Sequence, residues 1–550
     1  MLKLSDVRLT EKKDAAGLRL AVAEILGVGV SAINDLSILK LSVDARKKPD
    51  VRFVYTLLVS TDDEQALLRG GKVSKASGED RYSFPSPGNQ KMKRPPVVVG
   101  SGPAGLFAAL CLAEAGIKCV VLERGLPVER RLIDVSNFWR GGTLDISSNV
   151  QFGEGGAGTF SDGKLTTGIS DKRVRFVLER LVGFGAPEDI LYLSKPHIGT
   201  DRLRAVVRAF RDRLLELGCE IRFGHKLTDV DIHGGASVEG GALRGVSVDG
   251  GGAAYRLETD TLILAPGNSA RDTFEMLMRR GFRLTPKAFS VGVRIEHLQR
   301  DIDFAQYGAG VHCANLPAAE YKLVTHLPPH PSVFPVGKGR SVYTFCVCPG
   351  GQTVAAASEH GGVVTNGMSM YSRDGENISG ALLVSVTPDD FSCGTPGHAA
   401  SASALEGVEF QRRLERAAFA AGGGDYRAPA QLVGDFMKKR ASEGHGKITP
   451  TYMPGVRYCD LWNVLPEFVC EALRAALPEF AGRVEGFADP DAVMTAVETR
   501  SSCPVRIERK DHEAVGIRGI FPCGEGSGYA GGIMSSAVDG IKCAEAIVAL

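Results

Sequence analysis

Residues 97–105 read Val-Val-Val-Gly-Ser-Gly-Pro-Ala-Gly, an apolar run that passes directly into a glycine turn. The next ten residues have the composition of a buried helix. In a Gly-x-Gly-x-x-Gly turn of this kind, the first glycine allows a tight turn out of a strand. The second allows the backbone to approach a pyrophosphate, and the third allows the helix to pack closely on the strand. The stretch predicts the first strand, turn and helix of a dinucleotide-binding fold. The alternative is a glycine turn made only for packing.

A carboxylate stands where such a fold binds a ribose. The apolar run 118–122 predicts the second strand, and it ends at Glu123, 18 residues after Gly105. A carboxylate at this position accepts hydrogen bonds from an adenosine ribose and would repel a 2′-phosphate. We therefore expect FAD or NAD rather than NADP. The residues predicted to contact this end of the cofactor are Gly100, Gly102, Pro103, Ala104, Gly105, Glu123 and Arg124.

The C-terminal end of the chain favours FAD over NAD. Residues 519–526, GIFPCGEG, predict a strand running into a glycine turn with a carboxylate, and a helix follows from 533. Glu525 is placed to accept from ribityl hydroxyls, and the N-terminus of the helix can face the flavin edge where negative charge gathers on reduction. The segment 264–268, LAPGN, matches the strand-then-glycine loop between these regions. The cofactor contacts predicted here are Ala265, Gly267, Gly524, Glu525, Gly531, Gly532 and Ile533. For each of these segments taken alone, the alternative is a strand-turn-helix unit that serves only packing.

A second glycine run, 153–165, also satisfies Gly-x-Gly-x-x-Gly. The preceding residues SSNVQF are not a buried strand, and no helical pattern follows at once, so we reject a second dinucleotide-binding unit. A backbone wrapped near the pyrophosphate or flavin is the preferred interpretation, with contacts from Gly155, Gly156, Ala157 and Gly158; an ordinary glycine loop is the alternative. The lack of a second unit and of a Cys-x-x-Cys pair argues against a disulfide reductase.

Composition limits the remaining classes. The chain has 550 residues, 65 Lys and Arg, and 64 Asp and Glu, and its 12 cysteines are scattered. Balanced charge gives no bulk attraction to nucleic acid or membranes. No apolar stretch approaches the roughly 20 residues that span a bilayer, and the first residues lack a signal peptide's apolar region. We expect a cytoplasmic protein with reduced thiols and no membrane partner.

The predicted fold class is α/β. A discontinuous Rossmann-type FAD-binding domain, 95–275 and 512–550, includes a β-meander. Residues 276–511 form a mixed α+β cap or substrate domain. Residues 1–90 form a small α+β module, whose β-α-β-β-α order suits a ferredoxin-like sandwich. The basic turn Arg46–Lys48 in that module is a solvated hairpin tip or a patch for RNA or a protein partner.

The sequence resembles the uncharacterised bacterial FAD-dependent dehydrogenases of the glutathione-reductase-like flavoprotein class. The resemblance spans about 95–550, and the N-terminal module is also similar to the one in that family. It implies non-covalent FAD and an oxidoreductase, and it supplies no substrate. The matching strings are VVVGSGPAGLFAALCLAEAG, QFGEGGAGTFSDGKL, AFSVGVRIEH, FCVCPGG, NGMSMYSR, AVETRSSCPVRI and FPCGEGSGYAGGIMSSAVDG.

The cap segment carries the candidates for catalysis. Arg294 and Glu296 alternate on one strand as an ion pair, or Arg294 binds an anion while His297 moves a proton. The two cysteines of FCVCPGG point to one side of any strand, too close for an easy disulfide; they are a buried pair, or one thiol faces the flavin. Glu498 and Arg500 form a second ion pair or line the cavity. The candidates are Arg294, His297, Cys346, Cys348, Glu498 and Arg500.

The sequence thus predicts an FAD-dependent oxidoreductase that transfers hydride through flavin N5, with an unknown small-molecule substrate and NADH or NADPH as a transient donor. It contains no predicted metal site. Two alternatives remain. One is an FAD-dependent RNA-modifying enzyme with RNA delivered by the N-terminal module, and the other is a non-catalytic redox sensor.

Overall fold

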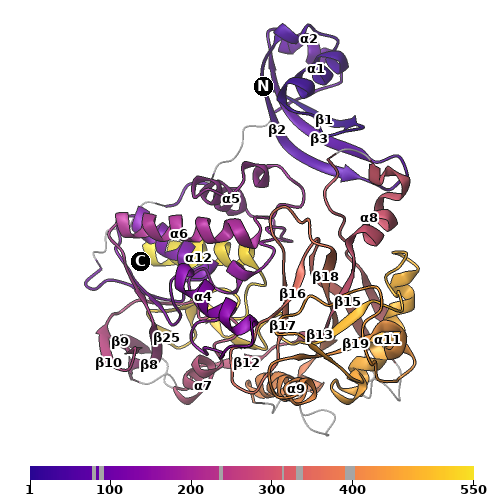
Figure 1. Ribbon diagram of the computed structural model, residues 1–550. Helices are drawn as coiled ribbons and strands as arrows, with labels where there is room; N and C mark the ends of the chain where they lie inside the picture. The colour runs from indigo at the N-terminus through magenta and orange to yellow at the C-terminus, as the bar shows by residue number, and fades with distance from the viewer. Residues whose placement is uncertain are drawn as a thin grey trace.

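The computed structural model describes residues 1–76, 82–85, 92–234, 240–312, 315–329, 339–390 and 403–549. Two large bodies lie side by side, and a small N-terminal module projects from them (Figure 1). One large body is built on a parallel sheet and the other on a mostly antiparallel sheet. The chain passes from the first body into the second and returns to the first at its C-terminal end.

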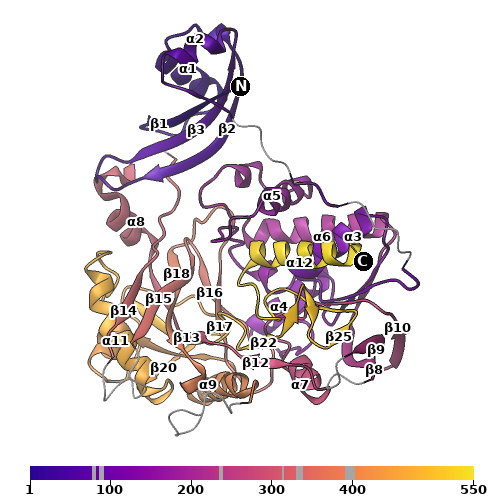
Figure 2. The ribbon, with the colours of Figure 1, turned by 180° about the vertical axis from the view of Figure 1, so that it is seen from behind.

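A five-stranded parallel sheet in the order β26-β11-β5-β6-β7 forms the centre of the first body. β5 and β11 run parallel, with Val97 opposite Leu262. Both are three-residue strands buried on both faces, which is why all of their residues are apolar. Helices α3 and α12 pack against each other beside this sheet (Figure 2). The strands are β5 (Val97–Val99), β6 (Val120–Glu123), β7 (Glu220–Phe223), β11 (Leu262–Leu264) and β26 (Ile520–Pro522).

Two helices of this body, α3 and α12, were predicted from the sequence. α3 begins three residues earlier than the sequence predicts, because Pro103 suits the first helical position and Gly102 precedes it. The helices are α3 (Pro103–Glu114), α4 (Val128–Trp139), α5 (Arg173–Gly183), α6 (Thr200–Glu216), α7 (Arg271–Arg279) and α12 (Ile533–Val548), with 3-10 turns at Ala157–Phe160 and Glu188–Leu191.

The expected β-meander is present between β7 and β11. β8 (His225–His233), β9 (Gly241–Gly250) and β10 (Ala254–Glu258) pair antiparallel in sequence, and β25 (Ile517–Arg518) adds to β9 in parallel. β23 (Arg509–Lys510) and β24 (Glu513–Ala514) form a short hairpin before it.

The second body, which we call the cap, is built on a seven-stranded sheet in the order β14-β15-β18-β13-β21-β19-β20. Its central strand, β13, is buried along its whole length. The sheet strands are β13 (Phe289–Leu298), β14 (Val324–Leu327), β15 (Arg340–Cys348), β18 (Asn377–Val386), β19 (Ala428–Leu432), β20 (Val456–Tyr458) and β21 (Val493–Glu498). The helices are α8 (Gln299–Tyr307), α9 (Glu406–Gly422), α10 (Val433–Met437) and α11 (Glu467–Ala481), with 3-10 turns at Gly308–His312, Pro388–Asp390 and Leu461–Asn463.

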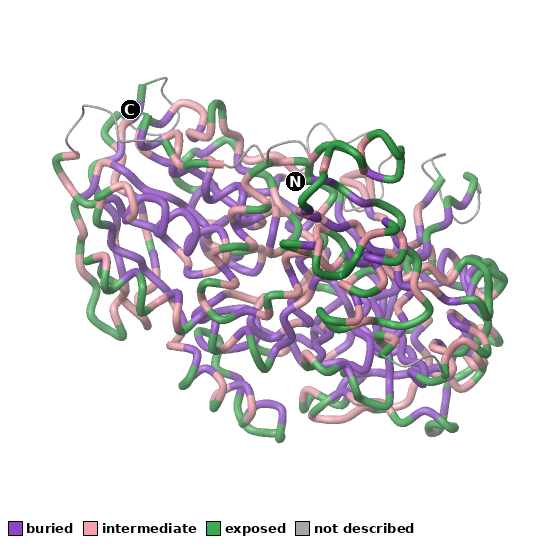
Figure 3. Tube along the Cα trace, turned by 90° about the horizontal axis from the view of Figure 1, so that it is seen from above, coloured by how far each residue is buried: buried purple, intermediate pink, exposed green. Residues whose placement is uncertain are grey.

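Two small sheets complete the cap. β16 (Gln352–Ala355) and β17 (Thr365–Met368) form a hairpin, and β12 (Leu284–Pro286) pairs with β22 (Val505–Ile507). Buried segments run through the centre of the molecule, and exposed segments lie toward its edges and over the N-terminal module (Figure 3). Among the described residues, no helix combines the length and the apolar character needed to cross a bilayer.

The N-terminal module contains a four-stranded sheet in the order β2-β3-β1-β4 with antiparallel neighbours. Its elements are β1 (Leu2–Leu9), α1 (Ala15–Leu26), β2 (Ile33–Asp44), β3 (Arg52–Thr61), α2 (Glu64–Arg69) and β4 (Ser74–Lys75), with a 3-10 turn at Val30–Ala32.

The basic turn of this module docks onto the cap. The Lys48 ammonium donates to the carbonyl oxygen of Ala305 in α8, and Arg46 donates to Asp44 at 2.7 Å. Leu41 also exchanges backbone hydrogen bonds with the segment 192–194 of the first body. Two of the three basic residues at this turn are therefore engaged within the chain, which lessens the charge available for RNA.

The packing of α3 on β5 generates the first prediction. A β-carbon at Gly105 would lie 1.9 Å from the carbonyl oxygen of Gly100, which is backbone and cannot move aside. Gly105→Ala should therefore lower the free energy of unfolding by about 1–3 kcal/mol, seen as a lower thermal midpoint by circular dichroism. Gly183→Ala, at a helical glycine with open space around it, should keep or raise the midpoint. Equal midpoints for the two variants would contradict this packing.

Candidate functional site

A cavity of about 940 Å³ lies where the parallel sheet of the first body meets the cap. Ligands bind to open parallel sheets at this edge, outside the carboxyl ends of the strands, and the volume is in the range of large ligand sites. The segments that line it begin at the ends of β5, β6, β11 and β26. They also include residues from 151–169, 320–322, 344–347 of β15, and 498–506 from the end of β21 onward.

Four glycine-containing loops meet at the floor of this cavity. A β-carbon on Gly100 would lie 2.2 Å from the carbonyl oxygen of Ala265, and one on Gly156 would lie 3.0 Å from the α-carbon of Gly102. A β-carbon on Gly526 would lie 2.4 Å from the carbonyl oxygen of Gly267. The loops can approach this closely only because side chains are absent, so the cavity floor is largely backbone.

Glu123 holds two of these loops together. One carboxylate oxygen accepts from the backbone N–H of Ser101 at 2.9 Å and from its hydroxyl at 2.7 Å. The other accepts from the N–H groups of Gly125 at 2.9 Å and Gly153 at 3.0 Å. The side chain is buried and lines the cavity. Glu123 therefore joins the first glycine loop to the second, in addition to the ribose contact predicted for it.

Arg131, which the sequence did not single out, fixes the second glycine loop. It is fully buried on α4 and donates to the carbonyl oxygens of Asn149, Val150, Glu154 and Gly156 at 2.7–2.9 Å. Its side chain also fills the space beside Gly153, where a β-carbon would lie 2.4 Å from its Cδ. A single arginine in this segment carries no sequence signal for such a role.

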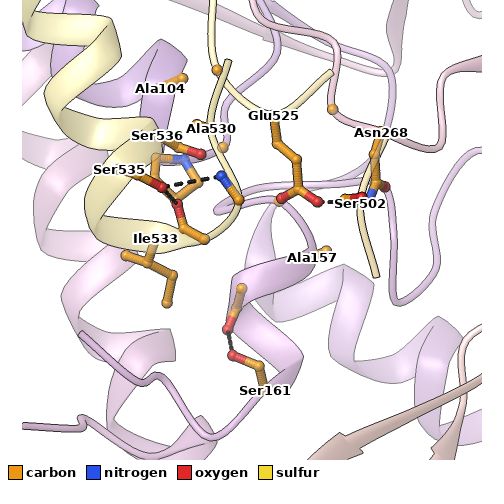
Figure 4. A pocket seen from close by; sticks show the side chains of 18 of the residues that line it. Ala104, Ala157, Ser161, Asn268, Ser502, Glu525, Ala530, Ile533, Ser535 and Ser536 are labelled. Carbon is orange, nitrogen blue, oxygen red and sulfur yellow. Dashed lines mark hydrogen bonds between the residues drawn. The ribbon is translucent and has the colours of Figure 1, made fainter. Parts of the chain in front are cut away.

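Two helix N-termini face the cavity without side-chain caps. Gly102 precedes α3 and Gly532 precedes α12; both glycines line the cavity, and neither helix has a capping side chain. Such helix ends present N–H groups and a positive partial charge to anions. Opposite the start of α12, Glu525 accepts from the side-chain amide of Asn268 at 2.8 Å (Figure 4). Burial raises the pKa of Glu525 to about 7, and the hydrogen bond from Asn268 opposes this rise.

Most of the predicted cofactor contacts come together in this cavity. Gly105 and Gly155 are not among the lining residues; Gly105 packs on Gly100, and the N–H of Gly155 donates to Ser101. The predicted residues that line it are Gly100, Gly102, Pro103, Ala104, Glu123, Arg124, Gly156, Ala157, Gly158, Ala265, Gly267, Gly524, Glu525, Gly531, Gly532 and Ile533.

The ion pairs in the cap differ from those expected. The guanidinium of Arg294 lies 3.6 Å from Glu498, not paired with Glu296, because Glu498 ends the neighbouring strand β21. Glu296 instead accepts from the hydroxyl of Thr451 at 2.6 Å.

The second expected pair is also replaced. Arg500 pairs with Glu415 of α9 at 3.0 Å, not with Glu498. Burial alone would raise the pKa of Glu415, but Arg271 and Arg500 hold it well below its usual range. Both Glu498 and Arg500 line the cavity, which was the other alternative expected for them. A catalytic role for either residue stays a prediction.

The remaining candidates separate from one another. His297 lies in the cap core, where its Nε2 is 2.8 Å from the carbonyl oxygen of Phe487 and burial lowers its pKa to about 4. It does not line the cavity, so the structure gives no support to His297 as a proton carrier there. Cys348 is fully buried, whereas Cys346 is half-buried and lines the cavity.

Charged residues outside the predicted set also line the cap side. Glu320 pairs with Lys164 at 2.7 Å and with Lys195 at 2.9 Å. Burial opposes the effect, but these two ammonium groups lower the pKa of Glu320 to about 2. Lys287 and Lys322 line the cavity as well. Lys164 lies in the second glycine run, whereas Glu320, Lys287 and Lys322 lie outside every motif singled out in the sequence.

The residues present fit a flavin dinucleotide. Backbone approach at Gly102 and Gly156, and two uncapped helix N-termini, suit a pyrophosphate and the anionic edge of a reduced flavin. The buried carboxylate of Glu123 and the half-buried carboxylate of Glu525 suit two sets of sugar or ribityl hydroxyls. These groups line one cavity.

Comparisons with protein families agree with this geometry. Residues 288–501 match a family described as "FAD-dependent protein, C-terminal domain-like", and residues 96–159 match an FAD binding domain. Residues 1–60 match a domain of unknown function. An uncharacterized protein of Clostridium beijerinckii is 43% identical over 550 residues, which cover 100% of this chain and 98% of that protein.

Solved flavoenzymes resemble the chain only distantly. The flavin-dependent brominase Bmp2 is 13% identical, with 83% of this chain and 79% of that chain covered and a TM-score of 0.36. BexE, described in relation to oxidation during BE-7585A biosynthesis, is 22% identical over 46% of this chain, with a TM-score of 0.20. The chain spans 43% of BexE, less than half of its length. Likenesses at this level do not identify a reaction.

The contacts of Glu123 generate the second prediction. Glu123→Ala removes four hydrogen bonds to the glycine loops and the carboxylate predicted to bind the ribose, so FAD affinity should fall by about 1–3 kcal/mol, or about 5- to 150-fold. The measurement is a titration of the apoprotein with FAD. Glu220→Ala on the adjacent strand β7 removes an exposed carboxylate paired with Arg222 and should leave the affinity unchanged. Wild-type affinity in the Glu123 variant would show that the carboxylate does not serve the cofactor.

Proposed function

We propose that this protein is an FAD-dependent oxidoreductase with its substrate site on the cap side of the cavity. The chain belongs to the same family of FAD-dependent proteins as the Clostridium beijerinckii relative. When bound, FAD supplies a two-electron centre that accepts and returns hydride at N5. We further propose a small polar substrate, with NADH or NADPH as the first donors to test.

The continuity of one cavity from the glycine loops to the cap carries this proposal. Its floor comes from the dinucleotide-type sheet, and its opposite wall comes from the ends of cap strands β15 and β21. A molecule bound against that wall would share the cavity with the cofactor. A site built only to store FAD would not need ionisable groups on the far wall.

Glu498 is the cap residue suited to move a proton in that reaction. It is the last residue of β21, it is buried, and it lines the cavity. Burial raises its pKa to about 7, and Arg294 opposes this rise. A general acid or base works best when its pKa lies near the working pH.

The N-terminal module has a separate place in the proposal. Its strand order and antiparallel pairing support a ferredoxin-like sandwich. Lys48 and Arg46 bind within the chain, but Arg46 stays exposed. A role of this turn in binding RNA or a protein partner stays a prediction.

A stopped-flow screen under anaerobic conditions is the experiment that tests this function. NADH, NADPH and a panel of small polar metabolites are mixed with the FAD-loaded protein, and loss of flavin absorbance is followed. At least one donor should reduce the bound flavin at least about 10²-fold faster than free FAD at the same concentration. If no donor does so, the oxidoreductase assignment is wrong.

A pair of cavity variants tests the place of the substrate. Glu498→Gln should retain FAD yet slow flavin reduction by about 10²–10⁴-fold, because a proton carrier is lost. Glu320→Gln is the matched control: its carboxylate also lines the cavity, but its pKa of about 2 leaves it ionised and unable to give up a proton near neutral pH. Equal rates for Glu498→Gln and wild type would remove Glu498 from the proposal.

A further inference from the structure

A break in strand β15 places two thiols beside a buried arginine in the cap wall. β15 pairs with β18 up to Phe345 opposite Ala381, and pairing resumes at Cys348 opposite Ser379. Two residues of β15 therefore stand opposite a single residue of β18, which is a β-bulge. Cys346 lies in this bulge with φ of 41°. A non-glycine residue in that region is uncommon, and such backbone gathers at functional sites.

The backbone of Cys346 is held from two sides. Its carbonyl oxygen accepts from Nη2 of Arg294 at 3.1 Å, and the sulfur of Cys348 lies 3.4 Å from the same oxygen. Nη2 of Arg294 also lies 3.8 Å from the sulfur of Cys348. Cys348 and Arg294 are both fully buried, so the half-buried side chain of Cys346 is the member of the group that faces the cavity.

The charge around this group favours a thiolate. Arg294 has no exposed surface, and among the described residues its Nη1 has no hydrogen-bond partner, although Glu498 lies 3.6 Å away. A hydrogen bond from Cys348 lowers the pKa of Cys346 to about 6, and the charges of Arg294 and Lys164 act in the same direction. Burial and the carboxylate of Asp162 oppose them.

Glu498 complements the thiolate. The negative charge of Cys346 adds to burial in raising the pKa of Glu498 to about 7. Near neutral pH Cys346 is therefore mainly a thiolate, and Glu498 is protonated in about half of the molecules. The pair combines a nucleophile with a proton donor on one wall of the cavity.

We propose that Cys346 is a catalytic thiolate that adds to the electron-poor carbonyl carbon of an aldehyde or ketone substrate, with Arg294 and Cys348 as its positioning residues. The inference rests on the proposed function, because it takes the substrate to lie on the cap side. In the addition, Sγ forms a bond to the carbon and the C=O π pair moves to the oxygen. That oxygen takes the proton of Glu498, and no electrons are gained or lost.

The test is the pH profile of alkylation by iodoacetamide, whose carbon forms a bond to sulfur as iodide leaves. The FAD-loaded full-length protein is labelled between about pH 5 and about pH 9, and each cysteine peptide is followed by mass spectrometry. The rate at Cys346 should have its midpoint at about 6, against about 8.5 for an ordinary thiol. Cys459 is the internal control, because it is also half-buried and burial raises its pKa to about 11.

Two variants separate positioning from a merely structural role. Cys348→Ala should raise the midpoint of Cys346 by at least about one pH unit, because a donor to the thiolate is lost. Cys348→Ser retains a donor and should restore a midpoint near that of wild type. Both are compared at full FAD loading. An unchanged midpoint in Cys348→Ala would overturn the role given to Cys348.

Acrylamide is a second, uncharged probe of the thiolate, because thiolates attack its β-carbon and the carbonyl group stabilises the charge that results. It should form an adduct at Cys346 of the wild type, and that adduct should be absent from Cys346→Ser. The inference fails if Cys346 is not labelled in the FAD-loaded protein, or reacts no faster than Cys459 at neutral pH. A reactive Cys346 in a protein whose flavin no donor reduces counts against the proposed function alone. A reducible flavin beside an unreactive Cys346 counts against this inference alone.

Discussion

The close approach of glycine-containing loops at one edge of the parallel sheet is the constraint on which the rest of the cavity depends. Gly100 lies against Ala265 and Gly526 against Gly267 at separations that leave no room for a β-carbon, and a β-carbon on Gly156 would lie only 3.0 Å from the α-carbon of Gly102. The cavity floor is therefore made of backbone and of two uncapped helix ends. A ligand with a pyrophosphate can approach such a floor closely, whereas side chains would keep it away.

Buried charges hold these loops in place. An isolated buried charge is costly, and it persists only where hydrogen bonds or an opposite charge compensate for lost hydration. Glu123 accepts from N–H groups of three segments, and Arg131 donates to carbonyl oxygens along a single loop. In the cap, Arg294 performs a related task at the bulge of β15. The same kind of compensation thus shapes both walls of the cavity.

The features that the sequence predicted well are local. The turn at 100–105 and the run 153–165 have glycines at fixed spacing, and the steric reason for those glycines acts within a few residues. The meander and the C-terminal strand, turn and helix were also predicted from local glycine turns. The FAD binding domain match covers residues 96–159, which include the turn at 100–105.

The features that the sequence did not predict depend on residues far apart in the chain. The partner of Arg294 is Glu498 because β21 lies next to β13, and alternation along β13 alone pointed to Glu296. The bulge at Cys346 is visible only against the register of β18. Arg131 and Glu320 lie in segments whose composition is ordinary, so their roles follow from the tertiary fold.

The central claim is that this single cavity binds a non-covalent FAD. The flavin content of the purified protein tests that claim most directly. The account predicts a yellow protein that releases FAD, and not FMN, on denaturation, in an amount equal to the chain concentration after reconstitution with excess FAD and removal of the unbound cofactor. Chromatography of the released flavin against both standards gives the identity and the amount. A protein that is purified without flavin and cannot be reconstituted with FAD, or that releases FMN, would contradict it.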